Sequence, residues 1–369
     1  MKFLFDKYLS IFTKMGVQMK SYLRIAMAFI CMLILAGSFA RAQDLQQQLS
    51  KLGSNAAVGY ATPLLSGIGN DLNSGIYYSA DLHDILGFDL GVKFATSKIT
   101  DADKSFTLDL PTQLAYTYTK NNIQYATIYT SNQFKGNVAG SPGKLTTATA
   151  VGDKKGGVVT STTDNTAFSS NGSPDIVPAG TAIFEMPGGF DLGKLGVPLA
   201  MPQLDLGLPF GLEFMLRYIP TTSAGDAGKF NYMGFGLRYS IDQWIPLCPV
   251  DLAVHFMTQK LTFKSSSDQD IFTGKATAYG VEVSKKLFIL TLYGGFQMES
   301  STLTLADYIY AGADPTLQGV TINGFEVKGS DKSRFTVGAR LLLLFINVHA
   351  DYSFATNSVL TLGAGITLR

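Results

Sequence analysis

Apolar residues alternate with small or polar residues in many short segments of this chain. The last of these segments, residues 359–369, reads V-L-T-L-G-A-G-I-T-L-R and has an apolar side chain at every second position from Leu360 to Leu368. This two-residue period predicts a strand with one apolar face. It returns about a dozen times in segments of roughly ten residues, the length that a tilted strand needs to cross a bilayer.

The strands predicted by this period share a second property. The face opposite the apolar one carries charged residues and glycines. The segments are Phe88–Phe94, Phe106–Tyr118, Ile123–Tyr129, Phe210–Tyr218, Phe235–Ile241, Val250–Phe256, Tyr279–Val283, Phe288–Phe296, Phe335–Leu341 and Ile346–Phe354. Asn121-Asn122 predicts a tight hairpin turn between two of them. Counted back from the C-terminus, the pattern gives twelve strands, or fourteen if residues 72–82 or a hairpin in a long loop contribute.

The connections between these segments are alternately short and long. The longest are residues 131–180 and 301–332, whereas Lys285-Lys286 and Leu344-Phe345 mark short ones. Outer-membrane barrels have this asymmetry, with brief periplasmic turns and extended outer loops. We therefore predict an all-β protein, an antiparallel transmembrane β-barrel of 12 to 14 strands over residues 87–369. Two alternatives stay open: a secreted soluble β-protein, and a disordered linker at residues 131–180.

Residues 1–42 have the features of an N-terminal secretory signal. An apolar run at residues 25–40 follows Lys20 and Arg24 and ends in Ala40-Arg41-Ala42, which predicts cleavage before Gln43. A single-pass anchor is the alternative, although the run is short for a membrane span. The start is ambiguous, since either Met1 or Met19 could begin the protein.

Composition narrows the class further. The chain is 46% hydrophobic and 15% charged, with 38 glycines. Residues 1–42 hold six of its 29 basic and one of its 28 acidic residues, so the remainder is net negative. A nucleic-acid partner is therefore not expected, because such proteins carry a basic surface. Cys248 stands alone outside the signal, which excludes an internal disulfide.

If the apolar face of the barrel meets lipid, the charged residues of the other face line the lumen. Both signs are present in quantity, and such residues either pair across strands and fill the interior or form a selectivity lining. The lumen-lining candidates are Asp89, Lys93, Asp109, Glu213, Arg217, Arg238, Asp251, His255, Glu282, Glu299, Arg334, Arg340, His349 and Asp351.

No catalytic site is expected. His349 and Asp351 share a strand face and could form a charge-assisted pair, but no G-x-S-x-G motif supplies a nucleophile. Asp268, Asp270 and Asp307 do not have the spacing of a calcium loop. We therefore predict no enzyme activity, no metal site and no cofactor.

Residues 43–86 differ from the rest of the chain. Leu45, Leu49 and Leu52 have helical spacing, and the glycine-rich stretch that follows is too irregular for a barrel strand and too apolar for a free tail. A plug folded into the lumen would account for both properties. A periplasmic helix followed by an edge strand is the alternative.

The stretch L-N-S-G-I-Y-Y-S-A-D-L-H-D-I-L-G-F-D-L-G-V-K at residues 72–93, after P-L-L-S-G-I-G, resembles the opening of a family of uncharacterised outer-membrane barrels from Gram-negative bacteria. That family is distantly similar to the long-chain fatty-acid transporter (FadL-type) barrels. The resemblance implies that an N-terminal hatch plugs the barrel, but it transfers no ligand residue. The chain also ends in Leu368-Arg369 and lacks the aromatic last residue usual in such barrels.

These observations favour a channel in the bacterial outer membrane for passive uptake of small hydrophobic molecules, with residues 43–86 as the hatch. A structural or surface-exposed barrel with a closed lumen, acting through its outer loops, is the alternative. The expected partners are outer-membrane lipid, a small hydrophobic ligand and, during biogenesis, the barrel-assembly machinery.

Overall fold

The computed structural model describes residues 54–192, 195–223, 228–264, 268–309 and 321–368. The predicted signal, residues 1–42, and the predicted helix around Leu45–Leu52 lie outside the described residues. No helix in the described part of the chain is both long and apolar enough to cross a membrane.

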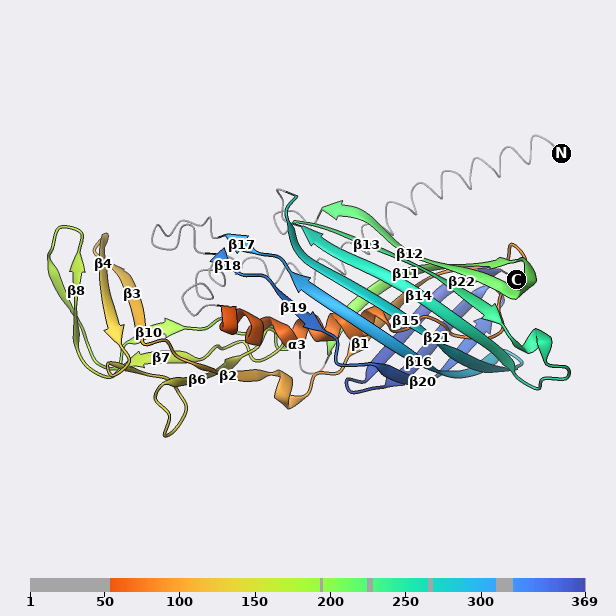
Figure 1. Cartoon of the computed structure of the whole chain (residues 1–369), viewed down its shortest axis with the longest axis horizontal. Coiled ribbons are helices and arrows are strands. Elements are labelled where there is room, and N and C mark those ends of the chain that lie inside the picture. Colours follow the sequence, from red (N-terminus) through yellow and green to blue (C-terminus); the bar gives the residue numbers. More distant parts are fainter. Residues whose placement is uncertain (1–53, 193–194, 224–227, 265–267, 310–320, 369) are drawn as a thin grey trace.

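A closed antiparallel barrel forms the larger part of the molecule (Figure 1). Its ten described strands follow one another around the wall, and pairing of β15 with β16 closes it. They are β1 (Phe88–Ser97), β11 (Val197–Leu208), β12 (Leu212–Ser223), β13 (Lys229–Ser240), β14 (Asp251–Lys264), β15 (Asp270–Leu287), β16 (Leu290–Leu305), β20 (Ser333–Leu343), β21 (Ile346–Phe354) and β22 (Val359–Leu368). The first and last, β1 and β22, are paired over their full length, from Phe88 with Leu368 to Ser97 with Val359.

Three short strands lie near the end of the wall away from the C-terminus. β19 (Phe325–Lys328) pairs with the end of β16, so that the barrel sheet gains one strand beyond the closed ring. β17 (Tyr308–Ile309) pairs with β18 (Thr321–Ile322). Among the described residues, short 3₁₀ turns occur at η1 (Asp101–Asp103), η2 (Pro209–Gly211) and η4 (Asp242–Trp244).

Residues 98–196, between β1 and β11, form a separate lobe that we call the extension. Figure 1 shows it at the end of the barrel opposite the C-terminus. It contains three small sheets, β2–β6, β10–β7–β5 and β3–β4–β8–β9. Their bounds are β2 (Ser105–Asp109), β3 (Gln113–Lys120), β4 (Ile123–Thr130), β5 (Phe134–Lys135), β6 (Lys144–Ala148), β7 (Val158–Ser161), β8 (Asn165–Ser169), β9 (Pro174–Val177) and β10 (Ala182–Glu185).

The extension explains why the predicted count of 12 to 14 barrel strands is too high. The alternating segments at 106–118 and 123–129 are strands, and Asn121 and Asn122 form their hairpin turn with φ of 53° and 61°. However, their large residues do not face lipid. Leu114 and Tyr129 are buried in a core of the extension, because a two-residue period shows that a strand has an apolar face but not what covers it.

The helix α3 (Ser54–Leu72) connects the extension with the barrel interior (Figure 1). Ala56, Ala57 and Tyr60 pack in the core of the extension, while Leu65 and Leu72 pack with inward-facing residues of the barrel wall. The sequence predicts irregular backbone here, since Pro63 and several glycines disfavour a helix. The helix forms nonetheless because the surrounding wall packs against it. Gly67 and Gly69 approach Val197 and Leu303 so closely that a Cβ at either position would overlap them.

The outer and inner faces of the barrel wall differ sharply in character. Along β20, β21 and β22, every second side chain is apolar and faces outward, and most of these are large and exposed, for example Phe335, Val348 and Leu362. The residues between them point inward and are buried, although many are charged. The lumen is therefore the polar core of this molecule, and it holds the candidate site.

Candidate functional site

Residues 70–84, which we call the inner segment, continue from the end of α3 through the barrel interior to the start of β1. Along most of their length their side chains are at most 6% exposed, including polar ones such as Asn70, Asp71 and Ser79. Gly75, with φ of +59°, turns the chain just after the helix, and an added Cβ there would meet Thr361 of the wall at 2.8 Å. The inner segment thus occupies the space that the wall encloses.

Arg217 of β12 binds the end of α3. Its guanidinium donates to the main-chain oxygens of Leu72 at 2.9 Å and of Ser74 and Gly75 at 2.8 Å each. The last carbonyl groups of a helix lack partners within the helix and carry partial negative charge, so a cation stabilises them. Gln259 donates to the same Leu72 oxygen at 2.7 Å.

Arg334 of β20 holds the opposite side of this turn. It forms a two-pronged ion pair with Glu299, at 2.8 and 3.0 Å, and donates to the Asn70 oxygen at 2.9 Å and to the Ser74 hydroxyl. Gln297 donates to the Asn73 oxygen at 2.9 Å. Such planar pairing fixes the guanidinium geometrically, so the turn is held in one position.

Further along the inner segment, the side chains of Tyr77 and Tyr78 contact different strands of the wall. The Tyr78 ring is stacked on His349 at 4.8 Å and lies between two cations, with the Arg340 guanidinium carbon 4.7 Å and the Lys93 ammonium 5.0 Å from its centroid. Cation–π contacts of this kind are strong when water is excluded. Tyr77 packs 5.3 Å from His255 and 6.1 Å from Tyr293, beside Gly295, where a Cβ would overlap the Tyr77 hydroxyl.

A further set of contacts between the wall and the inner segment lies near the start of β1. Glu213 accepts from the main-chain nitrogen of His83 at 3.0 Å, and the same oxygen lies 2.6 Å from Nδ1 of the His83 ring. Arg238 bridges Glu213 at 2.5 Å and Glu282 at 2.7 Å, and it also donates to the Ser79 oxygen. Ser284 accepts from the Ala80 nitrogen at 3.0 Å. These residues are buried, so the wall charges neutralise one another around the segment.

The sequence-predicted lumen residues fall into two groups. Asp89, Lys93, Glu213, Arg217, Arg238, His255, Glu282, Glu299, Arg334, Arg340, His349 and Asp351 are all buried within the barrel. Asp251 is only partly buried, at the barrel end, where it accepts from Ser284 at 2.8 Å. Asp109 is misplaced by the prediction, since it belongs to β2 of the extension and lies exposed, 3.0 Å from Lys144.

His349 and Asp351, which the sequence placed on one strand face, bind different partners. Nδ1 of His349 lies 2.9 Å from the Asn347 amide oxygen, and Asp351 accepts from the Tyr293 hydroxyl at 3.1 Å. Sequence reasoning missed the neutral Gln203, Gln259 and Gln297. Their positions on the same strand faces as the charged residues are the signal that could have identified them.

Three described gaps border the inner segment. Between residues 73–77 and the wall around Arg334 and Asp351, the gap has no room for a water molecule. A crevice of about 190 Å³ lies beside α3, and another of about 290 Å³ lies at the opposite end beside Asp81 and Phe210. The inner segment lies between these two crevices.

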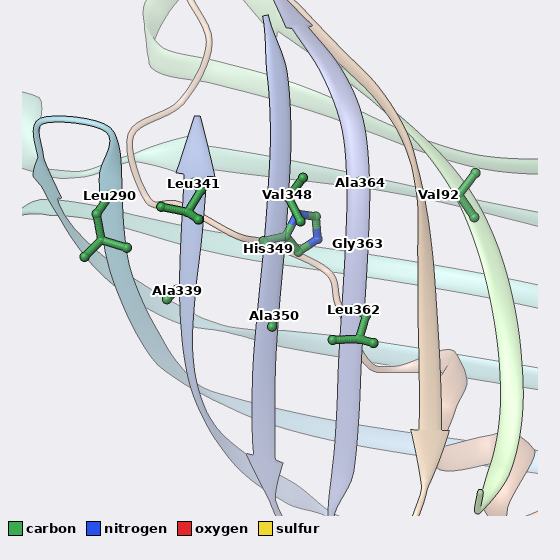
Figure 2. A pocket seen from close by; sticks show the side chains of 10 residues that line it. All are labelled: Val92, Leu290, Ala339, Leu341, Val348, His349, Ala350, Leu362, Gly363 and Ala364. Carbon is green, nitrogen blue, oxygen red and sulfur yellow. The ribbon is translucent and has the colours of Figure 1, made fainter. Parts of the chain in front are cut away.

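A further hollow lies on the outer face of the wall. It measures about 620 Å³ and crosses the five neighbouring strands β16, β20, β21, β22 and β1 (Figure 2). Small residues form its floor, among them Ala339, Ala350 and Gly363, and Leu341 and Leu362 border it. Its lining is apolar except for His349, which suits hydrocarbon rather than a polar solute.

The structures of several bacterial outer-membrane proteins show a remote likeness to this chain. A loop L8 deletion mutant of OmpT, an outer membrane protein of Vibrio cholerae, is 12% identical, covers 76% of this chain and 99% of its own, and has a TM-score of 0.24. The beta domain of the Bordetella autotransporter BrkA is 9% identical, covers 77% of this chain and 100% of its own, and has a TM-score of 0.27. A mutant of the TodX monoaromatic hydrocarbon channel is 10% identical, covers 78% and 90%, and has a TM-score of 0.27.

TM-scores this low support no argument about function, and the similarity to long-chain fatty-acid transporters stays a prediction. No curated protein matches the chain. Residues 19–368 match the profile of a Family of unknown function (DUF6588).

Proposed function

The chain belongs to the DUF6588 family, whose function is unknown, and we propose that it is an outer-membrane barrel, sealed by its own residues 54–86, that holds the extension at the bacterial surface. The observation that carries this proposal is the inner segment, whose main-chain oxygens are bound by wall side chains along its length. This is the closed-lumen alternative of the sequence analysis.

Membrane placement is supported by the outer face of the barrel. Pairing between neighbouring strands closes the ring and satisfies most main-chain groups, apart from half of the seam between β11 and β12. Such pairing is the condition for strands to cross hydrocarbon. Large apolar side chains such as Phe256, Phe296 and Tyr352 are between 37% and 48% exposed on its outside. A water-soluble barrel would place polar residues at these positions.

The contents of the lumen argue against passage of hydrophobic molecules through its centre. Lys93, Arg217, Arg238, Arg334 and Arg340 are buried there together with carboxylates. A hydrophobic solute would have to separate these charges from their partners without replacing the lost hydrogen bonds, which is costly. A sealed interior needs no such passage.

The lengths of the strand connections support a position of the extension on the outer side of the membrane. The connections on the C-terminal side are short, as in the periplasmic turns of outer-membrane barrels. The extension and the long connection between β16 and β20 lie at the other end, which then faces outward. The described residues contain no cluster of three or more His, Cys, Asp or Glu side chains that could hold a metal ion.

The experiment combines a permeability measurement with surface accessibility. Liposomes that contain the purified full chain should not swell in iso-osmotic sugar solutions. On intact cells, an added protease should cut the extension while the barrel stays intact. Rapid swelling would contradict the sealed lumen, and an extension that is cut only after the outer membrane is permeabilised would contradict the surface placement.

A second candidate, a channel with a lateral route for hydrophobic molecules, is favoured by a gap in the wall. β11 and β12 pair only from Gln203 with Arg217 to Leu208 with Leu212, so the first half of β11 and the second half of β12 are not joined. The main-chain nitrogen of Gly207 donates to the oxygen of Gly87, directly before β1. Successive residues of a strand direct their nitrogens to opposite sides, so the even-numbered residues of β11 direct theirs toward β12. Pro198 and Pro202 therefore lack the donors that would close this seam.

Replacing the prolines tests this candidate. In Pro202→Val/Pro198→Val the missing donors return and the two strands can pair further. If the seam is the route, uptake of a hydrophobic fluorescent probe by cells should fall. Pro249→Val, at a turn on the other end of the wall, is the matched control. Equal uptake by cells with and without the protein would exclude the channel altogether.

A further inference from the structure

The barrel end that carries the C-terminus has an unusual composition in its turns. Antiparallel pairing brings to this one end the start of β1, the end of β22, and the connections β11–β12, β13–β14, β15–β16 and β20–β21. Each connection among them presents at least one large apolar residue outward. We call this set the apolar turn collar: Leu86, Phe210, Trp244, Leu247, Phe288, Leu344 and Phe345.

The exposure of the collar is extreme. Leu247 is 100% exposed, Leu344 91%, Phe288 90%, Phe210 86%, Leu86 77% and Trp244 73%. Most of these residues also have left-handed backbone, with φ of 67° at Leu86 and Phe210, 61° at Leu247, 60° at Phe288 and 57° at Leu344. Water-exposed turns usually place glycine, asparagine or aspartate at such positions, because a branched or bulky side chain is strained there.

Large apolar residues with left-handed backbone occur in four strand connections and in the turn before β1, which indicates a shared environment. A turn in water would gain from asparagine or glycine at each position, both in backbone conformation and in solvation. A large apolar residue is favoured only if the tip of the turn leaves water. The collar therefore points to an apolar medium beyond the ends of the strands.

The height of the outward-facing apolar rows supports the same conclusion. On β20 the apolar row runs from Phe335 to Leu343, and Ser333 ends it on the extension side. On β16 the row runs from Leu290 to Met298, and Ser300 ends it on the same side. Nine residues at the usual strand rise and tilt give a band about 20 Å high, whereas membrane barrels carry a band of about 25 Å. The rows on β16 and β20 reach the collar without a polar margin, whereas on β15 the exposed Lys285 lies between Val283 and Leu287. On β16 and β20 the collar can therefore supply the missing height.

From these observations we propose that the apolar turn collar inserts into the acyl-chain region of the lipid leaflet at the C-terminal end of the barrel, and completes the hydrophobic thickness of the wall. The inference rests on the membrane placement proposed above. The collar is continuous with the lipid-facing rows on β16 and β20, and the carboxylates Asp81, Asp84 and Asp242 of this end line the central crevice. Lys285 and Lys286 are the exposed charges beside the β15–β16 turn, and their long side chains can reach the polar headgroups. A lipid leaflet contacts a barrel at its rim, which fits this division.

The chain contains a single tryptophan, Trp244, and it lies in the collar. The test therefore uses its fluorescence in the full chain reconstituted into phosphatidylcholine vesicles with bromine on the acyl chains. Bromine near the glycerol end of the chains should quench Trp244 more strongly than bromine near the bilayer centre, and dissolved iodide should quench it weakly. Emission should also shift to shorter wavelength relative to the denatured chain.

Reporter variants in a Trp244→Phe background extend the test around the rim. Leu344→Trp and Phe288→Trp should behave like Trp244. Phe335→Trp, in the wall, should be quenched best by deep bromines, and Phe168→Trp, in the extension, should respond to iodide alone. Vesicle flotation separates the two claims: a chain that does not float overturns both the membrane placement and the collar proposal. A chain that floats while its collar reporters behave like Phe168→Trp overturns only the collar proposal, and this is also the result expected if the collar binds a protein.

Discussion

At the scale of single residues, Arg217 shows how the lumen is organised. Its guanidinium is fully buried, and its hydrogen bonds reach main-chain oxygens and the amides of Gln203 and Gln259. Charge-assisted hydrogen bonds to carbonyl groups are strong in a dry interior, and the groups left behind on removal of the donor would be buried without partners. The wall therefore recognises the backbone of the inner segment more than its side chains.

We expect Arg217→Met to lower the free energy of unfolding by about 3 kcal/mol, because the main-chain oxygens of Ser74 and Gly75 lose this donor and that of Leu72 keeps only Gln259. Trp244 fluorescence during urea titration in lipid vesicles measures the change. Lys328→Met, on an exposed position of β19, serves as the control. An Arg217→Met chain as stable as the control would show that this clamp does not hold the segment.

Asp175 in the extension gives a prediction for pH. The hydrogen bond from the Lys120 ammonium, helped by that from the Tyr118 hydroxyl, holds the pKa of Asp175 below its ordinary value. A group with a lowered pKa in the folded state stabilises it above the ordinary carboxyl pKa, and this contribution is lost as the pH falls through the lowered pKa.

Amide hydrogen exchange of strands β3 and β9 should therefore accelerate in acid beyond the intrinsic pH effect. In Lys120→Met the acceleration should begin at higher pH, because the carboxyl pKa returns toward its ordinary value. Exchange in β3 and β9 that has the same pH profile in both chains would refute this role of the ion pair.

At the scale of elements, the sequence predicted some parts and not others for physical reasons. The barrel strands such as β21 and β22 were found because a wall that is apolar outside and polar inside requires strict alternation along the whole segment. The strands β3 and β4 were found too, but assigned to the wrong sheet, since the core of the extension imposes the same period as lipid. The helix α3 was missed because its stability comes from the wall around it, which local sequence does not contain.

The glycines of α3 test this dependence on the wall. A Cβ at Gly69 would lie 2.6 Å from the Ser301 hydroxyl oxygen and 2.7 Å from a Leu303 methyl carbon. Gly69→Val should therefore displace the helix and destabilise the chain by about 2 kcal/mol. Gly143→Ala, where an added Cβ meets nothing within 4 Å, is the control. Urea titrations that do not distinguish the two variants would contradict close packing of α3 against the wall.

At the scale of the whole molecule, the charges predicted for the lumen were the most informative part of the candidate site. Pattern alone identified most of the buried charges, because inward positions on a lipid-facing strand are fixed by its period. It could not show which charges meet, since pairs such as Arg334 with Glu299 come from different strands. The pattern also could not show that the inner segment is held through its main chain, because every sequence has the same main-chain carbonyl groups.

The picture that results is a narrow barrel with a peptide core, joined by α3 to a lobe at one end (Figure 1). The extension and the lumen are mechanically linked, since one helix contributes to the cores of both. Our central claim is that the barrel is closed to ions.

Ion conductance across planar lipid bilayers tests that claim most directly. The full chain, inserted and shown to be folded by its resistance to unfolding in detergent, should give no steady current steps in concentrated salt. A variant without the guanidinium clamps, Arg217→Met/Arg334→Met, should show fluctuating openings as the inner segment loosens. Regular, long-lived current steps from the unaltered chain would contradict the account.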